Sequence, residues 1–311
     1  MALASYCGGC GETPVRPECL NSFRRLGLVK VHWECWSECN LPCEFCYRTR
    51  GRVLSTSQGK TLISSVATSG VATLVFAGGD PSLRVDIGTL IRFAQKLALR
   101  VEVQTNGHHT PKEFLEALQS VDQVGLSLDG PNASTHDAFR NKPGNFDRVI
   151  SLMERLNQLK VPIIVRTVVA KGNHESVHLI GPMLRRLKNL VRWSLLEFSP
   201  VGEGYRNHSL YELDRSTFRT AAEHARIAFR DAGKIDVYGA GAKAGTYALI
   251  TPAGDMYGTA LSTVGGFFPT IGSILSEHLS DLASKLPFSK TSHLKRYGGE
   301  KGAVRGKLDD G

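Results

Sequence analysis

The chain has 311 residues and 41% hydrophobic side chains, enough for an α/β barrel with an appendage. It contains no run of about 18 apolar residues and no secretion signal at its start, so we expect a cytoplasmic protein without a membrane partner. The net charge of +9 comes from Lys and Arg residues spread along the chain, which favours an anionic small-molecule substrate over nucleic acid.

All seven cysteines lie in the first 46 residues, a clustering that fits metal binding in a reducing compartment. Residues 1–26 form a Gly- and Pro-rich arm carrying Cys7, Cys10 and Cys19. Together with Cys35 these make four cysteines, the number needed for a second iron–sulfur cluster or a structural zinc. The alternative is a loose arm with incidental thiols and a simply buried Cys35.

Strand and helix patterns alternate through the middle of the chain, which predicts parallel βαβ units with functional groups at the carboxyl ends of the strands. Strands are predicted at 28–33, 72–77, 100–105, 123–128, 161–169 and 191–198, and helices at 58–69, 86–99, 111–120, 145–159 and 175–188.

The last third of the chain follows a different pattern. A long helix over 215–231 precedes a hairpin at 246–250 and 256–260, built around a Pro/Gly turn, and a strand-to-helix segment over 271–286. The tail, 295–311, is predicted to be mobile or to form a lid. We therefore divide the chain into the arm (1–26), a barrel domain (27–213) and a C-terminal extension with its tail (214–311).

Cys39, Cys43 and Cys46 form a C-x3-C-x2-C motif just after the strand predicted at 28–33. Soft thiolates suit iron–sulfur clusters, copper(I) or zinc. Three cysteines rather than four would leave one iron of a [4Fe–4S] cluster without a protein ligand. By itself the motif is equally compatible with a zinc knuckle.

Two further motifs end the next two strands. Gly78-Gly79-Asp80-Pro81 follows the strand at 72–77, and Asn106 follows the strand at 100–105. With the cysteine motif, this order of residues resembles the radical S-adenosylmethionine (radical SAM) superfamily over residues 28–198. The resemblance implies a partial (β/α)6 TIM-like barrel with a small α+β extension at its C-terminus.

The resemblance also implies cofactors. Cys39, Cys43 and Cys46 would hold a [4Fe–4S] cluster, and the amino and carboxylate groups of SAM would chelate the fourth iron. Reductive cleavage of SAM would then give a 5′-deoxyadenosyl radical that abstracts hydrogen from a substrate. A reductant such as flavodoxin or ferredoxin is the expected electron donor.

Residues of the SAM site follow from the matching motifs. Phe45 would lie near the adenine, and the exposed carbonyls of Gly78, Gly79, Asp80 and Pro81 would accept hydrogen bonds from the SAM amino group. Asp80 stands where the family has Glu. The alternatives are ordinary packing for Phe45 and a plain strand–helix turn for the glycine motif.

The block from Ser127 through Asp129 to Arg140 is similar to the SPASM/Twitch-like members of the superfamily. By that likeness Ser127 and Arg140 hold the SAM carboxylate and Asp129 lies near the ribose or substrate. The Asn106 amide is suited to bind a ribose or carboxylate, and its alternative is to shape a turn with Gly107. The alternative for Arg140 is a solvated charge at a helix end. The candidate catalytic residues are Asp129, which follows the fourth strand, and Glu197, at the end of the sixth strand. Relatives on this side bind auxiliary clusters through C-terminal cysteines, which this chain lacks after residue 46.

Two substrate classes remain open from the sequence. A nucleoside, nucleotide or sugar acid undergoing decarboxylation, dehydrogenation or rearrangement fits the positive charge, and Val191-Arg192-Trp193 resembles the viperin-like nucleotide enzymes. A peptide- or protein-modifying maturase of a natural-product pathway fits the Ser127–Arg140 block. A third class, a metal-binding scaffold without SAM cleavage, is disfavoured by the intact motifs.

Overall fold

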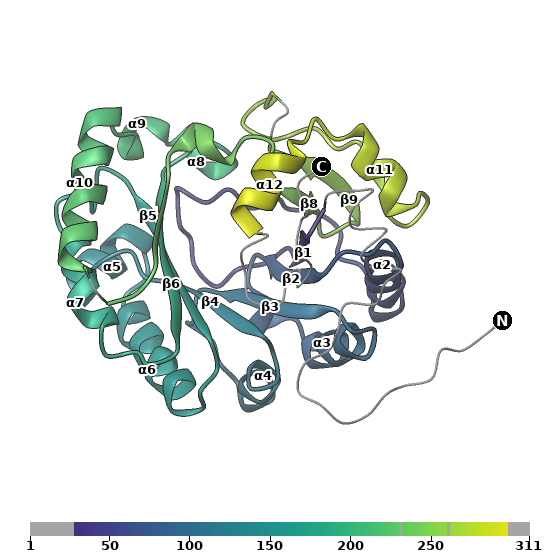
Figure 1. The fold of residues 1–311 in the computed structure, drawn as a ribbon, viewed down its shortest axis with the longest axis horizontal. Helices are drawn as coiled ribbons and strands as arrows, with labels where there is room; N and C mark the ends of the chain where they lie inside the picture. The colour runs from purple at the N-terminus through teal and green to yellow at the C-terminus, as the bar shows by residue number, and fades with distance from the viewer. Residues whose placement is uncertain (1–27, 231, 260–261, 298–311) are drawn as a thin grey trace, which may run out of the picture.

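The computed structural model describes residues 28–230, 232–259 and 262–297, and these form one curved sheet with helices on its outer side (Figure 1). Within them the sheet has ten strands in the order β10-β9-β8-β1-β2-β3-β4-β5-β6-β7. The strands are β1 (Lys30–Trp36), β2 (Thr73–Gly78), β3 (Arg100–Thr105), β4 (Gln123–Ser127), β5 (Ile163–Val169), β6 (Leu190–Glu197), β7 (Ile235–Tyr238), β8 (Ala248–Ile250), β9 (Asp255–Gly258) and β10 (Gly272–Ser273).

Strands β1 to β7 pair in chain order, each parallel to the next, and β8 is parallel to β1. Among the described strands, only the β8–β9 and β9–β10 pairs are antiparallel. Because β7 and β10 do not pair with each other, the barrel stays open. The predicted α/β class and partial barrel are confirmed, as are the six predicted strands, although their ends shift.

The outer helices are α2 (Thr56–Thr68), α3 (Ile87–Lys96), α4 (Lys112–Leu118), α6 (Asn145–Gln158), α7 (Ile180–Leu184) and α10 (Arg215–Ala228). Helix α2 shows why they form: Ser55 and Gln58 make a capping box, and Leu62 and Val66 bury one face against the sheet. None of the described helices is both long and apolar enough to cross a membrane.

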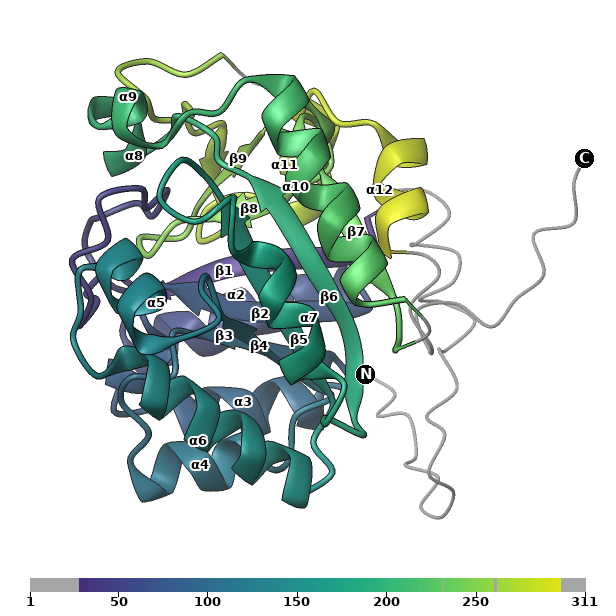
Figure 2. The same cartoon turned by 90° about the vertical axis from the view of Figure 1, so that its left-hand side faces the viewer.

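Short helices occupy the end of the barrel where the strands finish. These are α5 (Ala133–Arg140), α8 (Glu203–Arg206) and α9 (His208–Tyr211). Figure 2 shows α8 and α9 on the opposite side of the strands from α4 and α6. The cysteine loop and the loops after β2, β3 and β4 all follow the carboxyl ends of parallel strands, so they lie at one edge of the sheet. Parallel-barrel enzymes place their catalytic groups at this edge.

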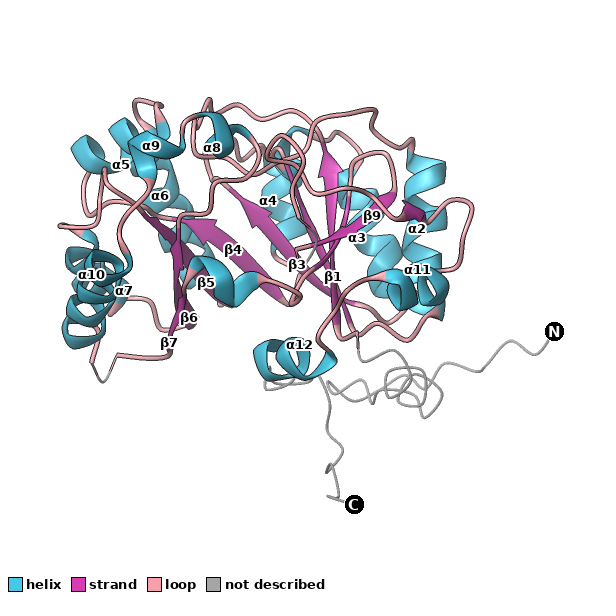
Figure 3. Cartoon of the chain, turned by 90° about the horizontal axis from the view of Figure 1, so that it is seen from above, coloured by secondary structure: helices cyan, strands magenta, loops and turns pink. Residues whose placement is uncertain are grey.

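The opposite end of the barrel is covered by α12 (Lys290–Tyr297), which follows α11 (Leu279–Lys285). Figure 3 shows α12 at the starting ends of the strands, away from α8. His293 Nε2 accepts hydrogen bonds from the backbone N–H groups of Val29 (2.9 Å) and Lys30 (3.2 Å), and its Nδ1 donates to Thr246 O at 2.8 Å. Residues up to 297 of the predicted tail therefore belong to a packed helix, and 298–311 lie outside the described residues.

The structure also differs from the sequence prediction in one helix and in two elements that were not predicted. The helix predicted over 175–188 is wrong in extent: it is a 3-10 turn (Val177–Leu179) followed by the short α7, because Pro182 has no N–H to continue a hydrogen-bonded ladder. The sequence reading also missed α5 and the four-residue β7. The predicted hairpin is confirmed as β8 and β9, but it extends the barrel sheet by pairing with β1.

Candidate functional site

The cysteine loop follows β1 and places three half-buried free thiols close together. Cys43 lies within electrostatic reach of Cys39 and Cys46, and Cys46 within reach of Cys39. Burial raises the pKa of all three thiols, that of Cys43 to about 12. Bound metal is what stabilises thiolates in such a setting.

The donor set fits the implied [4Fe–4S] cluster. The three cysteine thiols of this loop would each bind a different iron and leave the fourth iron without a protein ligand. Sγ of Cys39 also accepts a hydrogen bond from Asn106 Nδ2 at 3.4 Å.

The glycine turn after β2 lies against the backbone of the cysteine loop. Gly78 has φ = +129°, and a Cβ added to Gly79 would come within 1.9 Å of Glu38 O. Gly79 N donates to Trp36 O at 2.7 Å, and Asp80 N donates to Glu38 O at 2.8 Å. Glycine is therefore required here because two backbones touch.

Asp80 is buried beneath this turn, and its carboxylate is taken up by neighbouring donors. It accepts hydrogen bonds from Ser82 N (2.9 Å), Thr105 Oγ1 (3.0 Å) and Asn106 N (2.7 Å). Asn106 in turn donates through Nδ2 to Asn40 Oδ1 at 2.8 Å. Asp80 thus links the turn after β2 to Asn106 and the cysteine loop, a connection that the sequence motif did not reveal.

Arg140 and Asp129 form a buried ion pair, with Arg140 Nε 2.7 Å from Asp129 Oδ2. The other carboxylate oxygen of Asp129 accepts from Val168 N at 2.8 Å. The Arg140 guanidinium lies over the Phe45 ring, 5.7 Å from its centroid, and the Arg140 carbonyl accepts a hydrogen bond from Cys43 Sγ. Asp129 therefore fixes Arg140 from behind, and Arg140 faces the cysteines.

These elements surround a cavity of about 460 Å³. Of the predicted site residues, Cys43, Phe45, Cys46, Gly78, Gly79, Asp80, Asn106, Ser127, Arg140 and Glu197 line it. Cys39, Pro81 and Asp129 are not among its lining residues. Glu197 lies at the end of β6, where its Oε2 accepts a hydrogen bond from Ala240 N at 2.7 Å.

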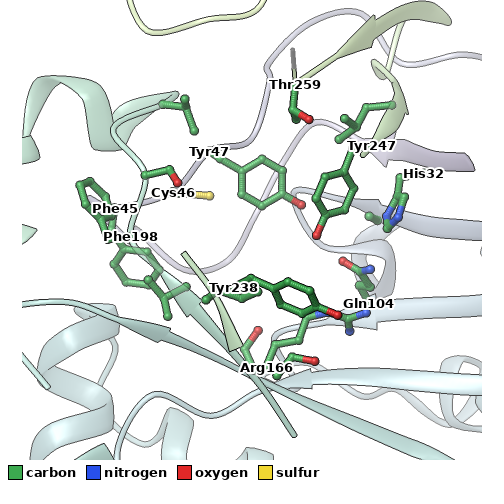
Figure 4. A pocket seen from close by; sticks show the side chains of 18 of the residues that line it. His32, Phe45, Cys46, Tyr47, Gln104, Arg166, Phe198, Tyr238, Tyr247 and Thr259 are labelled. Carbon is green, nitrogen blue, oxygen red and sulfur yellow. The ribbon is translucent and has the colours of Figure 1, made fainter. Parts of the chain in front are cut away.

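The cavity extends from the cysteines toward the start of β1. Figure 4 shows Phe45 and Cys46 at one side and His32 at the other, with Tyr238 between them. We call the region around Cys43, Cys46 and Arg140 the cysteine end. The opposite region is the basic end, which is lined by Lys30, Arg166, Arg192 and Arg296.

The basic end surrounds the buried carboxylate Glu102, which the sequence reading missed. Lys30 Nζ lies 3.0 Å from Glu102 Oε2, and Arg166 Nη2 pairs with Oε1. Burial opposes ionisation, but Lys30 and Arg166 hold the pKa of Glu102 well below its usual range. The sequence feature that could have revealed it is the charged Glu102 between two valines of the predicted strand Arg100-Val-Glu-Val103.

Between the two ends, Glu34 on β1 is almost fully buried. It accepts hydrogen bonds from the side chains of Thr49 and Tyr257, which line the cavity. Its Oε1 atom has no hydrogen-bond partner. Burial raises the pKa of Glu34 to about 7, so this carboxyl changes charge near neutral pH.

Arg48, two residues after Cys46, is another buried charge beside the cysteine loop. Its side chain is 8% exposed, and neither Nε nor Nη1 has a hydrogen-bond partner. The guanidinium lies within electrostatic reach of Cys39 and Cys46. A buried cation of this kind is stabilised when negative charge lies nearby, such as thiolates or an anionic metal centre.

The candidate second metal site is not assembled in the described residues. Cys35 lies on β1 inside the hydrophobic core, with no exposed surface. Burial raises the pKa of its thiol to about 12. Cys7, Cys10 and Cys19 lie outside the described residues. The position of Cys35 favours the alternative of a simply buried thiol.

An open parallel barrel with a three-cysteine loop at its functional edge defines a class of iron–sulfur enzymes. The sequence model described as "Radical SAM superfamily" matches residues 33–178. Residues 33–178 therefore carry a radical SAM domain, which implies an enzyme with a [4Fe–4S] cluster and SAM as cofactors.

The relatives are named for different activities. The chain is 33% identical over 184 residues to the AdoMet-dependent heme synthase of Methanosarcina barkeri, covering 56% of this chain and 52% of that protein. It is 23% identical over 285 residues to an S-adenosylmethionine-dependent nucleotide dehydratase of Selenomonas ruminantium, covering 87% and 99%. The chain spans only about half the length of the AdoMet-dependent heme synthases that it matches.

A solved structure supports the fold. SuiB of Streptococcus suis, determined with its precursor peptide SuiA, superposes with a TM-score of 0.68 at 17% identity. The match covers 91% of this chain and 69% of that one. It confirms the partial-barrel fold.

Proposed function

We propose that this chain is a radical SAM enzyme acting on a small anionic molecule, such as a nucleoside derivative, nucleotide or sugar acid. When bound, the cluster and SAM supply a 5′-deoxyadenosyl radical that abstracts hydrogen from the substrate. The observation that carries the proposal is a single cavity with the cysteines at one end and four cationic side chains at the other.

The residues of the cysteine end have separate tasks in this proposal. Cys39, Cys43 and Cys46 hold the cluster. Arg140, fixed through Nε by Asp129, presents its remaining donors to the SAM carboxylate. Asp129 is then a positioning residue rather than a group that touches substrate, since both of its oxygens are already bonded.

The glycine turn and its neighbours complete the SAM site. The carbonyls around Gly78 and Gly79 accept from the SAM amino group, and Asn106 and Ser127 bind its polar groups from β3 and β4. Phe45, packed 4.5 Å from the Phe139 ring centroid, gives the adenine an apolar contact. Glu197 lines the cavity beyond them and remains the candidate acid or base near the substrate.

A peptide substrate is the second candidate. It is favoured by the fold shared with SuiB, whose structure was determined with a precursor peptide. Against it, the basic end is closed by α12, whose Arg296 and Tyr297 line the cavity wall. A closed and charged end suits a compact anion better than an extended chain.

The test begins with anaerobic reconstitution of the wild type and of a Cys39→Ala/Cys43→Ala/Cys46→Ala variant, followed by iron and sulfide analysis. We expect about four irons in the wild type and none in the variant. About four irons retained by the variant would instead place a cluster on the remaining four cysteines.

Turnover is then measured as 5′-deoxyadenosine release under strong reductant. Nucleotide sugars, nucleotides and uronic acids are compared with a candidate precursor peptide. Faster 5′-deoxyadenosine release with an anionic small molecule supports the proposal. Faster release with the peptide alone supports the peptide substrate instead. An absence of 5′-deoxyadenosine from the reconstituted wild type would refute radical SAM activity altogether.

A further inference from the structure

The basic end gathers charges from both termini of the described chain. His32 lies within electrostatic reach of Glu102, Lys30, Arg166 and Arg296 at once. Glu102 is shared by Lys30 and Arg166 through its two oxygens. Such a concentration of cations in a largely enclosed space creates a strong positive potential.

The guanidinium group of Arg296 lies over two aromatic rings. Its guanidinium carbon lies 3.8 Å from the ring centroid of Tyr238 and 4.5 Å from that of Tyr247. Nε donates to Tyr297 Oη at 3.1 Å, and Nη2 donates to Tyr247 Oη. Stacking and hydrogen bonds therefore fix its plane, while its third nitrogen, Nη1, is buried without a partner.

Arg166, on β5, has a matching free donor. Its Nη2 pairs with Glu102, but its buried Nη1 has no hydrogen-bond partner. The guanidinium fits because residue 125 on β4 is glycine: a Cβ there would come within 1.9 Å of Nη1. Two guanidinium groups that line the cavity thus each keep a nitrogen without a hydrogen-bond partner, an arrangement that is costly without a ligand.

The surrounding phenols cannot neutralise these cations. Burial raises the pKa of Tyr238 and of Tyr297, so both rings stay protonated at neutral pH. The same holds for Tyr257 farther along the wall. These hydroxyl groups remain neutral hydrogen-bonding partners, and the positive charge of Arg296 is left for an incoming anion.

We propose that Arg296 and Arg166 form the seat for the anionic group of the substrate, a carboxylate or phosphate, at the basic end of the cavity. The proposal rests on the proposed function, since it assigns the far end of the same cavity. Each guanidinium keeps Nη1 without a partner beside the cavity, and the planar fork suits two-point binding of an oxyanion. The C-terminal helix α12 is then a specificity element.

The experiment measures ligand binding to the reconstituted full-length chain under anaerobic conditions, with and without SAM, by titration calorimetry. Three probes are used: uridine 5′-monophosphate carries a phosphate, glucuronic acid carries a carboxylate, and uridine is the neutral counterpart of the first. The variants are Arg296→Gln, Arg296→Lys and Arg166→Gln. Arg226→Gln, at an exposed position on α10, is the matched control.

We expect the wild type to bind at least one of the two anions more tightly than uridine. Arg296→Gln and Arg166→Gln should each weaken the binding of that anion by about tenfold or more, equal to about 1.4 kcal/mol. Arg296→Lys should lose less affinity. Arg226→Gln should bind like the wild type. Which anion is preferred tells a phosphate seat from a carboxylate seat.

Two results would overturn the seat: neither anion binds the wild type better than uridine, or Arg296→Gln and Arg166→Gln bind the anion unchanged. Loss of SAM affinity in Arg296→Gln would also overturn it, because the seat would then serve SAM. Iron content and 5′-deoxyadenosine release are recorded on the same samples. If these are normal while anion binding fails, the seat is wrong and the radical SAM activity stands.

Discussion

The two ends of the cavity are built in different ways. The cysteine end is made of contiguous motifs, each on the loop that follows one strand, and its backbones touch directly at Gly79 and Glu38. The basic end is made of single side chains from β1, β3, β5, β6 and α12, joined only by the fold. Chemistry common to a superfamily thus lies in short motifs, and the residues that would select a substrate lie in scattered positions.

The largest effect is expected where the cysteine end relies on a buried ion pair. Asp129→Ala leaves Arg140 buried without its partner, so we expect a loss of about 3–5 kcal/mol in the free energy of unfolding and loss of SAM binding. Urea denaturation and SAM titration measure both. Glu116→Ala, which removes an exposed pair with Lys112, should cost less than about 1 kcal/mol.

A pH-dependent effect is expected at Glu34, which lies between the two ends. Its pKa is about 7 in the folded chain and about 4.5 in the unfolded chain, so folding favours the protonated carboxyl. This contribution is complete below the unfolded value and is lost as the pH rises through the folded one, by about 3 kcal/mol at most.

Glu34→Gln cannot ionise, so its unfolding free energy should fall less than that of the wild type between pH 5 and pH 8. Urea denaturation of both proteins at the two pH values provides the test. Parallel pH dependences in the two proteins would show that Glu34 ionises normally in the folded state.

The contact between backbones at the cysteine end predicts the next effect. Gly79→Ala forces a methyl group into Glu38 O, so we expect about 1–3 kcal/mol of destabilisation and a lower iron content after reconstitution. Gly51→Ala, on the loop between β1 and α2, is the matched control because a Cβ there meets nothing within 4 Å. Equal stability of the two variants would contradict the tight approach.

The smallest effect concerns Arg48. If its unpaired guanidinium faces the bound cluster, Arg48→Gln removes a positive charge that favours the reduced state. We expect a midpoint potential lower by about 59 mV, the equivalent of a tenfold change in a one-electron equilibrium. Potentiometric titration followed by electron paramagnetic resonance measures this. Arg50→Gln, at an exposed position paired with Glu203, should leave the potential unchanged.

The sequence was sufficient for the parts of the fold and site that depend on local pattern. Six strands, the hairpin and the cysteine and glycine motifs each lie in one short stretch with its own turn or strand signal. The helix predicted over 175–188 is shorter in the structure, where Pro182 lacks the N–H that an uninterrupted helix needs. The catalytic reading of Asp129 rested on motif position, which does not show that Arg140 and Val168 N occupy its oxygens.

The basic end could not be predicted from local pattern. Lys30, Glu102 and Arg166 are single charges within apolar strands, and only the sheet register brings them together. Helix α12 is short and polar, and it is fixed through His293 to residues about 264 positions earlier. No window of sequence contains both partners of such a contact.

That long-range contact has a consequence for how the protein is made. Every strand of the barrel leaves the ribosome before α12, so a nascent chain can form its sheet while the starting ends of the strands are still uncovered. Val29 and Lys30 receive their His293 acceptor only when nearly the whole described chain has been synthesised. Completion of the cavity is therefore a late, high-contact-order step of folding. A chain stopped after β9 would carry the three cysteines without α12, the helix that closes the basic end of the cavity.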